Sequence, residues 1–150
     1  MALLSRSQDG SNLTSRGRLV ACSVVVIAAL LRVGAALKPL WFDEIWTLQL
    51  LERISSPLQI FTEIHLDNNH HLNSLYLFFV RPTVWWPAYR LHSIAVGVGV
   101  IPLAGFCARR SGRSATLLAM TLTAFSYPLI HYSSEARGYS LVVFFSLASF

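Results

Sequence analysis

Long apolar runs alternate with shorter polar segments along the chain. The first run covers 19–37, and at about 1.5 Å per residue it extends roughly 27 Å, enough to cross a bilayer. Similar runs cover 91–107 and 115–131, and a fourth occupies 139–150. This pattern predicts transmembrane helices, so we expect an all-α, polytopic integral membrane protein.

The polar segments between these runs complete the expected organisation. We expect a disordered cytoplasmic tail over 1–18, an outer segment over 38–90, a basic cytoplasmic turn over 108–114 and an outer turn over 132–138. The run over 139–150 is too short to cross a bilayer. We therefore expect the chain to be the front of a longer protein, with a truncated helix bundle.

The first run has a second interpretation as a cleaved signal peptide. It follows basic residues, and Val33-Gly34-Ala35 resembles a cleavage site. Arg32 interrupts the run, however, and further apolar runs follow it. We therefore favour a transmembrane helix.

Arginines indicate how the expected helices are oriented. Loops rich in Lys and Arg lie on the cytoplasmic side, which places the tail and the turn 108–114 inside and the segment 38–90 outside. Both basic segments lie inside only if the apolar stretch 72–86 does not cross. We expect that stretch to dip into the membrane or to lie along its outer surface, and a crossing stretch remains the alternative.

Composition supports a membrane protein and argues against a nucleic-acid-binding one. The chain is 54% hydrophobic and 13% charged, whereas soluble domains have roughly 45–50% apolar and 25% charged residues. The net charge is +5, but no basic stripe is interleaved with aromatic residues, so we expect no nucleic-acid partner. Cys22 and Cys107 fall inside apolar runs, where we expect buried small hydrophobic residues and no disulfide.

Two adjacent acids, Asp43 and Glu44, follow directly after the first apolar run. Desolvation by Trp41, Phe42 and Trp46 is expected to raise the pKa of a carboxyl at this place, which suits a general base. The alternative is a solvated helix start, where acids interact favourably with the helix dipole. Part of the surrounding segment has apolar residues at helical spacing, which predicts an interfacial helix: Trp41, Ile45, Leu48 and Leu51.

A histidine-rich stretch forms the second candidate site. His65, Asp67 and His70 are possible metal ligands, but their spacing matches no closed zinc site. We favour a role for His70 and His71 in holding a polar group of a substrate, and a divalent metal remains an open alternative.

The third candidate site lies in the outer turn that precedes the last run. We expect Ser133 or Ser134 to cap the following helix, with Arg137 in its first turn as a phosphate ligand. Glu135 is two residues from Arg137, so on a regular helix the two side chains face nearly opposite ways. The alternative is an interfacial arginine that extends outward to the headgroups and is paired with Glu135. Arg32 either extends outward to the headgroups or faces the bundle as a second cation for the same anion.

Four motifs, in this order, resemble the N-terminal part of the GT-C glycosyltransferases, in particular the bacterial relatives of the dolichyl-phosphate-mannose protein mannosyltransferases. The motifs are Phe42-Asp43-Glu44, His70-His71-Leu72-Asn73-Ser74-Leu75-Tyr76, Tyr89-Arg90-Leu91-His92-Ser93 and Tyr132-Ser133-Ser134-Glu135-Ala136-Arg137-Gly138-Tyr139. The second motif departs from the family, which commonly has His-Pro-Pro-Leu-Tyr there.

The resemblance implies a GT-C-like bundle in the inner (plasma) membrane. Such an enzyme transfers a sugar from a polyprenyl-phosphate donor to a hydroxyl of a glycan, lipid or protein acceptor on the outer face, with inversion. By similarity, Asp43 is the base, Glu44 orients the acceptor or the helix, and Arg137 neutralises the leaving phosphate. The remaining candidate substrate-binding residues are His70, His71, Glu135, Tyr139 and Arg32. Some members of the family use a divalent metal and others do not, so the cofactor stays open.

Two alternatives do not involve catalysis. The chain could be part of a transporter in which Arg32 and Arg137 bind a moving anion. It could also be a membrane module whose outer segment binds a partner protein. Most charges lie at the ends of apolar runs and not near their centres, which favours the enzyme over the transporter.

Overall fold

The computed structural model describes residues 13–64, 70–83 and 85–150. Over these residues the chain is helical and contains no strand, which confirms the predicted all-α class. The elements are α1 (Ser15–Ala36), α2 (Phe42–Glu52), α3 (Gln59–Thr62), α4 (His71–Val80), η1 (Trp86–Arg90), α5 (Leu91–Ala108), η2 (Arg109–Ser111), α6 (Arg113–Phe125), α7 (Tyr127–Ser133) and α8 (Tyr139–Ala148).

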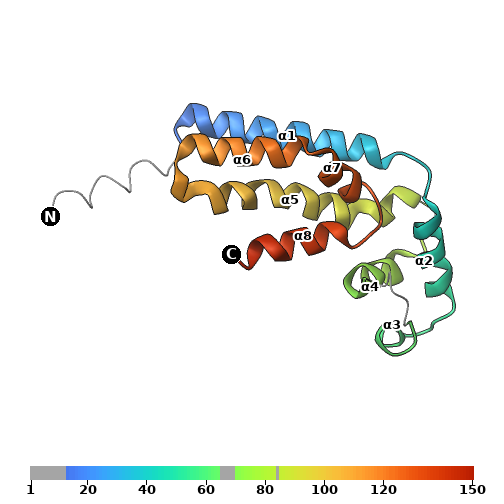
Figure 1. Ribbon diagram of the computed structural model, residues 1–150. Helices are drawn as coiled ribbons and strands as arrows, with labels where there is room; N and C mark the ends of the chain where they lie inside the picture. The colour runs from blue at the N-terminus through green and yellow to red at the C-terminus, as the bar shows by residue number, and fades with distance from the viewer. Residues whose placement is uncertain (1–12, 65–69, 84) are drawn as a thin grey trace.

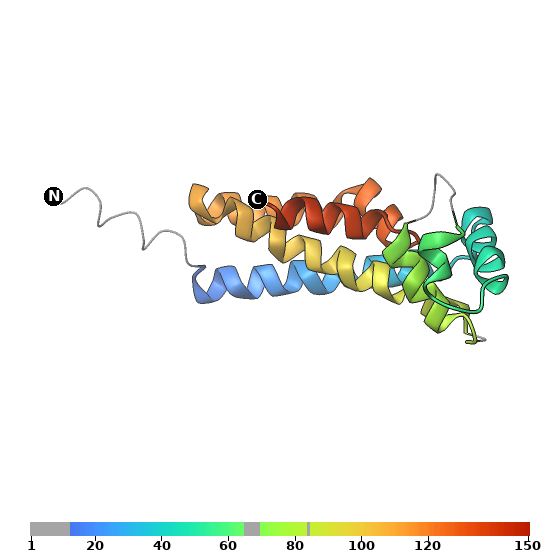
Figure 2. The ribbon, with the colours of Figure 1, turned by 90° about the horizontal axis from the view of Figure 1, so that it is seen from below.

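The helices fall into a bundle and a group of short helices beyond one end of it. Helices α1, α5, α6 and α8 lie side by side, and α7 lies at the end of the bundle where α8 begins (Figure 1). Helices α2, α3 and α4 lie beyond that same end in both views (Figures 1 and 2). Segments from three parts of the chain therefore meet at one end of the bundle.

Two helical stretches are long and apolar enough to cross a membrane. They are Ser15–Ala36, and Trp86–Ser111, which joins η1, α5 and η2. Large apolar side chains on α1 point away from the protein, among them Leu19 and Leu30, which are 70% and 67% exposed. An exposed apolar surface of this kind is compatible with contact to lipid or to another protein.

The first helix begins inside the expected tail of 1–18. The Thr14 side chain accepts a hydrogen bond from the backbone N–H of Gly17 at 3.1 Å, so α1 starts at Ser15. A threonine at this position satisfies one of the free N–H groups of the first turn. The tail prediction is therefore wrong for residues 15–18.

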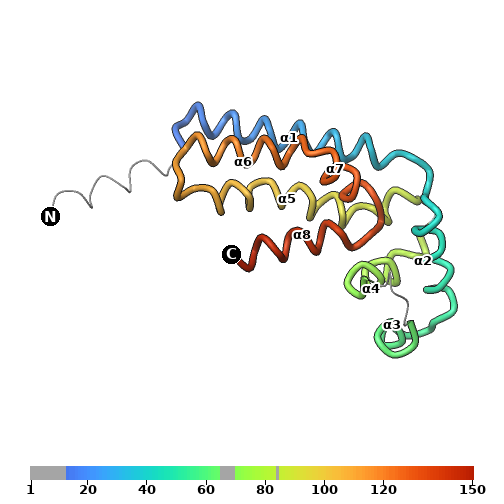
Figure 3. The backbone as a smooth tube through the Cα atoms, in the orientation of Figure 1, coloured from blue at the N-terminus to red at the C-terminus, as the bar shows by residue number. Residues whose placement is uncertain are grey.

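The expected single helix over 115–131 is wrong. Helix α6 ends at Phe125, Ser126 has extended backbone angles (φ −64°, ψ 115°), and α7 restarts at Tyr127 with Pro128 in its first turn. Proline cannot donate the backbone hydrogen bond of a helix interior, but it is tolerated in a first turn. The chain path changes direction between α6 and α7 (Figure 3).

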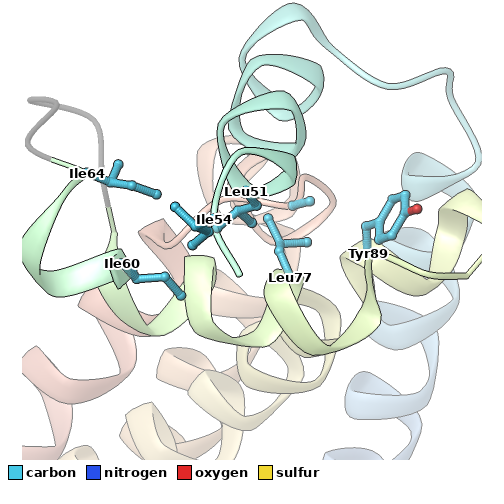
Figure 4. Close-up of a cluster of buried hydrophobic side chains, with 7 residues drawn as sticks. Leu51, Ile54, Ile60, Ile64, Leu77 and Tyr89 are labelled. Carbon is cyan, nitrogen blue, oxygen red and sulfur yellow. The ribbon is translucent and has the colours of Figure 1, made fainter. Parts of the chain in front are cut away.

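The short helices share a small apolar core. Leu51 and Ile54 from the end of α2 pack with Ile60 and Ile64 around α3 and with Leu77 of α4 (Figure 4). Helix α4 has 10 residues, about 15 Å of helix, which is shorter than a bilayer core. This length agrees with the expectation that the stretch 72–86 does not cross.

The two cysteines contradict the expected burial. Cys22 and Cys107 are free and exposed. Both lie in the two apolar stretches that could cross a membrane, and the outward faces of such helices contact lipid instead of protein.

Candidate functional site

Asp43 and Glu44, at the start of α2, face different surroundings. The Asp43 side chain is 35% exposed, whereas Glu44 is 1% exposed. Adjacent residues on a helix point about 100° apart, which explains the divergence. Glu44 is thus on the protein-facing side of α2, while Trp41 and Ile45 are exposed. Of the apolar residues at helical spacing that predicted an interfacial helix, Trp41 and Ile45 are exposed and Leu51 is buried.

Glu44 joins three distant segments through its two carboxylate oxygens. Oε1 accepts hydrogen bonds from Arg90 Nε at 2.8 Å and from the backbone N–H of Ala136 at 2.5 Å. Oε2 accepts from Arg90 Nη2 and from the backbone N–H of Trp41 at 2.7 Å, which also caps α2. With both oxygens occupied and no exposed surface, Glu44 positions the site and is not free to react.

These hydrogen bonds decide the charge state of Glu44. Burial alone would raise its pKa, but the bonds from Arg90, Ala136 and Trp41 outweigh burial and hold the pKa of Glu44 below its ordinary value. The sequence predicted that desolvation would raise the pKa of an acid at 43–44. For Glu44, the buried one of the two, this prediction is wrong.

Arg90 binds the end of the first helix to the start of the second. It is 2% exposed, and besides Glu44 it donates to the carbonyl oxygens of Ala36, Lys38 and Pro39 at 2.6, 2.7 and 3.0 Å. A buried guanidinium needs partners for its donors, and here each one is a carboxylate or a carbonyl.

Two further polar side chains hold the backbone of the turn between α7 and α8. The Asn73 amide donates to the carbonyl of Ala136 at 3.1 Å, and the Ser93 hydroxyl donates to the carbonyl of Arg137 at 3.0 Å. We call Glu44, Arg90, Asn73 and Ser93 the buried polar network. By fixing the turn, the network fixes where the side chains of Glu135 and Arg137 emerge.

The turn contradicts the expected helix cap. Ser133 is the last residue of α7 and Ser134 follows it, and their hydroxyls donate to carbonyls of α7 itself. Helix α8 begins at Tyr139 without a side-chain cap. Arg137 therefore lies in the turn before the helix and not in its first turn.

Arg137 forms an ion pair with Asp43, across 94 residues of sequence. Its Nη1 also lies 3.6 Å from Glu135 Oε2, and the other Glu135 oxygen lies 3.3 Å from His131 Nε2. Residues 134–138 do not form a regular helix, so the opposite orientation expected on a regular helix does not apply, and Glu135 and Arg137 lie together as in the alternative that pairs them. The side chains of Asp43 and Arg137 are both partly exposed, so a ligand can reach them.

His70 and Tyr139 border the ion pair. Their rings meet edge to face with centroids 5.0 Å apart, and the Arg137 guanidinium lies 5.2 Å from the Tyr139 ring. Gly138 packs directly on the His70 ring and leaves no room for a Cβ atom. Burial lowers the pKa of His70, and the charges of Arg137 and His71 lower it further, so this histidine is neutral at pH 7.

An open groove extends from His70 along α8. It has a volume of about 460 Å³, and His70, His71 and Gly138 lie at its polar end. Its apolar lining is Leu72, Leu141, Val142 and Phe145. His71 also stacks on Phe61 at 5.2 Å. The groove thus offers two imidazoles beside an apolar surface.

Arg32 does not join this site. It is 0% exposed within the bundle, and its Nη1 donates to the carbonyls of Ala28 and Ala124 at 3.1 and 3.2 Å. It therefore caps the end of α6, where the helix break leaves carbonyls unpaired. The expectation that Arg32 extends outward to the headgroups is wrong: its Nη1 and Nη2 donate to backbone carbonyls of α1 and α6.

The expected metal ligands cannot be placed together. His65 and Asp67 lie outside the described residues. Over 13–64, 70–83 and 85–150 no three His, Cys, Asp or Glu residues gather as a metal site would require.

The sequence alone assigns no role to Arg90, Asn73 or Ser93, although all three belong to the motifs that carry the resemblance. Arg90 is a charge directly before an apolar run, and Asn73 is an amide within another. A polar residue at such a place is costly unless it is paired, and that signal identifies both.

No protein-family model, curated protein or solved structure matches this chain.

Proposed function

We propose that this chain carries the catalytic end of a GT-C-type membrane glycosyltransferase that transfers a sugar from a polyprenyl-phosphate donor to an acceptor hydroxyl. The observation that carries the proposal is the contact between Asp43 and Arg137. A carboxylate and a guanidinium from distant parts of the chain meet, partly exposed, at the bundle end that also holds the histidine groove.

The two side chains suit the two ends of an inverting transfer. Asp43 takes the proton of the acceptor hydroxyl as its oxygen forms a bond to the anomeric carbon. The bond from that carbon to the phosphate oxygen breaks, and the electron pair leaves with the phosphate, whose charge Arg137 neutralises. For this step the ion pair must open and admit the sugar between its two side chains, so that the base and the cation act on opposite faces of the sugar and the configuration inverts.

The groove beside the ion pair is the proposed binding place for the sugar and for a hydrophobic part of the donor or acceptor. The imidazoles of His70 and His71 can form hydrogen bonds with sugar hydroxyls, and the apolar lining along α8 suits a hydrophobic group. In the orientation expected from the arginines, this end of the bundle faces outward, where donor and acceptor meet.

The transporter alternative requires Arg32 and Arg137 to bind the same anion. Arg32 donates to backbone carbonyls within the bundle, so it is not available for that role. The partner-binding alternative makes Asp43 and Arg137 replaceable, which the following experiment tests.

Membranes that contain the full-length protein are incubated with a polyprenyl-phosphate-linked labelled sugar and acceptor, and transfer is compared between wild type and Asp43→Asn. Because the variant keeps the shape but loses the base, we expect transfer to fall about 100-fold or more. Glu52→Gln, which removes an exposed acid from the same helix, is the control and should keep wild-type transfer. Equal transfer by wild type and Asp43→Asn would exclude Asp43 as the base, and no transfer by well-folded wild type would favour the partner-binding module.

A further inference from the structure

Two carboxylates already surround the guanidinium expected to bind phosphate. Asp43 Oδ2 accepts a hydrogen bond from Arg137 Nη2, and Glu135 Oε2 lies 3.6 Å from Nη1. One positive and two negative charges leave this group of three with a net negative charge. Such a group repels a phosphate, so one carboxylate must leave before a phosphate can bind.

The two carboxylates differ in how readily they can leave. Glu135 is 13% exposed, and His131 lies within 3.3 Å of its second oxygen. Asp43 is 35% exposed, and the only ion pair that its carboxylate makes within the described residues is with Arg137. Glu135 Oε2 makes no hydrogen bond to Arg137, so Asp43 is the carboxylate that occupies a donor of the guanidinium. An anion that binds this donor takes the place of Asp43, whose more exposed carboxylate can then be solvated.

Arg137 itself is held in place. The hydroxyl of Ser93 binds its carbonyl, and the preceding residue, Ala136, is bound through its N–H by Glu44 and through its carbonyl by Asn73. The backbone of the turn is thus fixed, whereas Asp43 needs only a side-chain rotation to move aside.

We propose that a phosphate-bearing ligand and the Asp43 carboxylate compete for Arg137, so that the phosphate, on binding, releases Asp43. Resting on the proposed function, this exchange means that the base becomes free only when the donor is bound. Without the donor, the ion pair keeps the carboxylate occupied. Asp43 then weakens phosphate binding even though the reaction needs it.

The test measures binding, without transfer, of farnesyl phosphate to the purified full chain in detergent, by titration calorimetry. Loss of the competing carboxylate in Asp43→Asn should tighten binding about fivefold, the scale of one partly exposed ion pair. Arg137→Gln should weaken binding at least about tenfold, because the charge-assisted hydrogen bonds are lost. Glu52→Gln controls for the change in net charge and should bind like wild type.

Equal or weaker binding by Asp43→Asn overturns the exchange. Asp43→Ala, which cannot form the pair either, provides a second reading if Asp43→Asn does not fold. A second titration with inorganic phosphate shows whether phosphate alone binds or whether the isoprenyl chain is also needed. Tighter binding of either probe to Asp43→Asn than to wild type supports the exchange. If Asp43→Asn binds the probe more tightly but wild type never transfers sugar, the exchange stands and the proposed function fails. If wild type transfers sugar but Asp43→Asn does not bind the probe more tightly, the proposed function stands and the exchange fails.

Discussion

At the scale of residues, the adjacent acids Asp43 and Glu44 differ in burial and bind different arginines. Asp43 is partly exposed and pairs with Arg137, whereas Glu44 is buried and pairs with Arg90. The sequence indicated that an acid pair at this place matters, and it identified Arg137 and His70 as candidates. It could not indicate which acid is buried, because the partners of Glu44 lie 46 and 92 residues away.

The buried acid makes stability depend on pH. The pKa of Glu44 is lowered from its ordinary value of 4.5, so its contribution is complete above that value and is lost as the pH falls through the folded-state pKa. At neutral pH, Glu44→Gln leaves Arg90 without its ion-pair partner, and we expect a cost of about 3 kcal/mol or more.

The measurement is the Tm of both proteins in detergent between pH 8 and pH 3. We expect the difference in Tm between wild type and Glu44→Gln to be constant in the upper range and to shrink only below about pH 4.5. Glu52→Gln, which lacks the buried pair, should follow wild type throughout. Parallel curves for wild type and Glu44→Gln down to the lowest pH would contradict this role of Glu44.

At the scale of elements, the apolar runs located α1 and α5 well and the later helices less well. The break that divides the expected third span into α6 and α7 could have been predicted from the sequence, because Pro128 lies in the first turn of α7. The cap at Ser133 or Ser134 could not be excluded in advance, because serine also bonds to carbonyls of its own helix, as both do here. Which group a polar side chain binds at a helix end depends on the tertiary structure, so the residues near it in the sequence do not predict it.

Helices α5 and α7 approach closely at Gly97. A Cβ atom there would collide with the Cβ of Ser133 and lie 3.4 Å from Arg32 Nε. We expect Gly97→Ala to lower the free energy of unfolding by about 1–3 kcal/mol, the usual cost of overpacking, seen as a lower Tm in detergent.

Gly34→Ala is the matched control, because a Cβ at Gly34 meets nothing within 4 Å and alanine favours helix by roughly 0.5–1 kcal/mol. Ser133→Gly, which removes the colliding atom, should restore part of the stability of Gly97→Ala. An unchanged Tm for Gly97→Ala would show that the helices tolerate a wider separation.

At the scale of the whole molecule, the acids that the structure describes gather at one end of the bundle, where five basic residues accompany them: Lys38, Arg53, Arg81, Arg90 and Arg137. The described acids are on α2, after α3 and in the turn before α8: Asp43, Glu44, Glu52, Glu63 and Glu135. Arginines at the start of α1 and around η2 gather at the opposite end (Figure 1): Arg16, Arg18, Arg109, Arg110 and Arg113. Arginine clusters of this kind orient membrane proteins with that end in the cytoplasm.

This orientation can be measured with single cysteines in a chain that carries Cys22→Ser and Cys107→Ser. Both Ser55, between α2 and α3, and Ser111, in η2, are exposed. In intact cells, a membrane-impermeant maleimide should label Ser55→Cys and should label Ser111→Cys only after permeabilisation. Labelling in the opposite order would reverse the orientation and place the candidate site inside the cell.

Glu44 is synthesised well before its partners Arg90 and Ala136, because both lie far beyond it in the sequence. Ribosomes add about 5–20 residues per second, so Glu44 precedes Ala136, 92 residues later, by roughly 5 to 18 s. Until Arg90 and then the turn are synthesised, the carboxylate has only its own helix start and water to bind. The Glu44 carboxylate therefore remains in contact with water until then, and this end of the molecule closes late in biosynthesis.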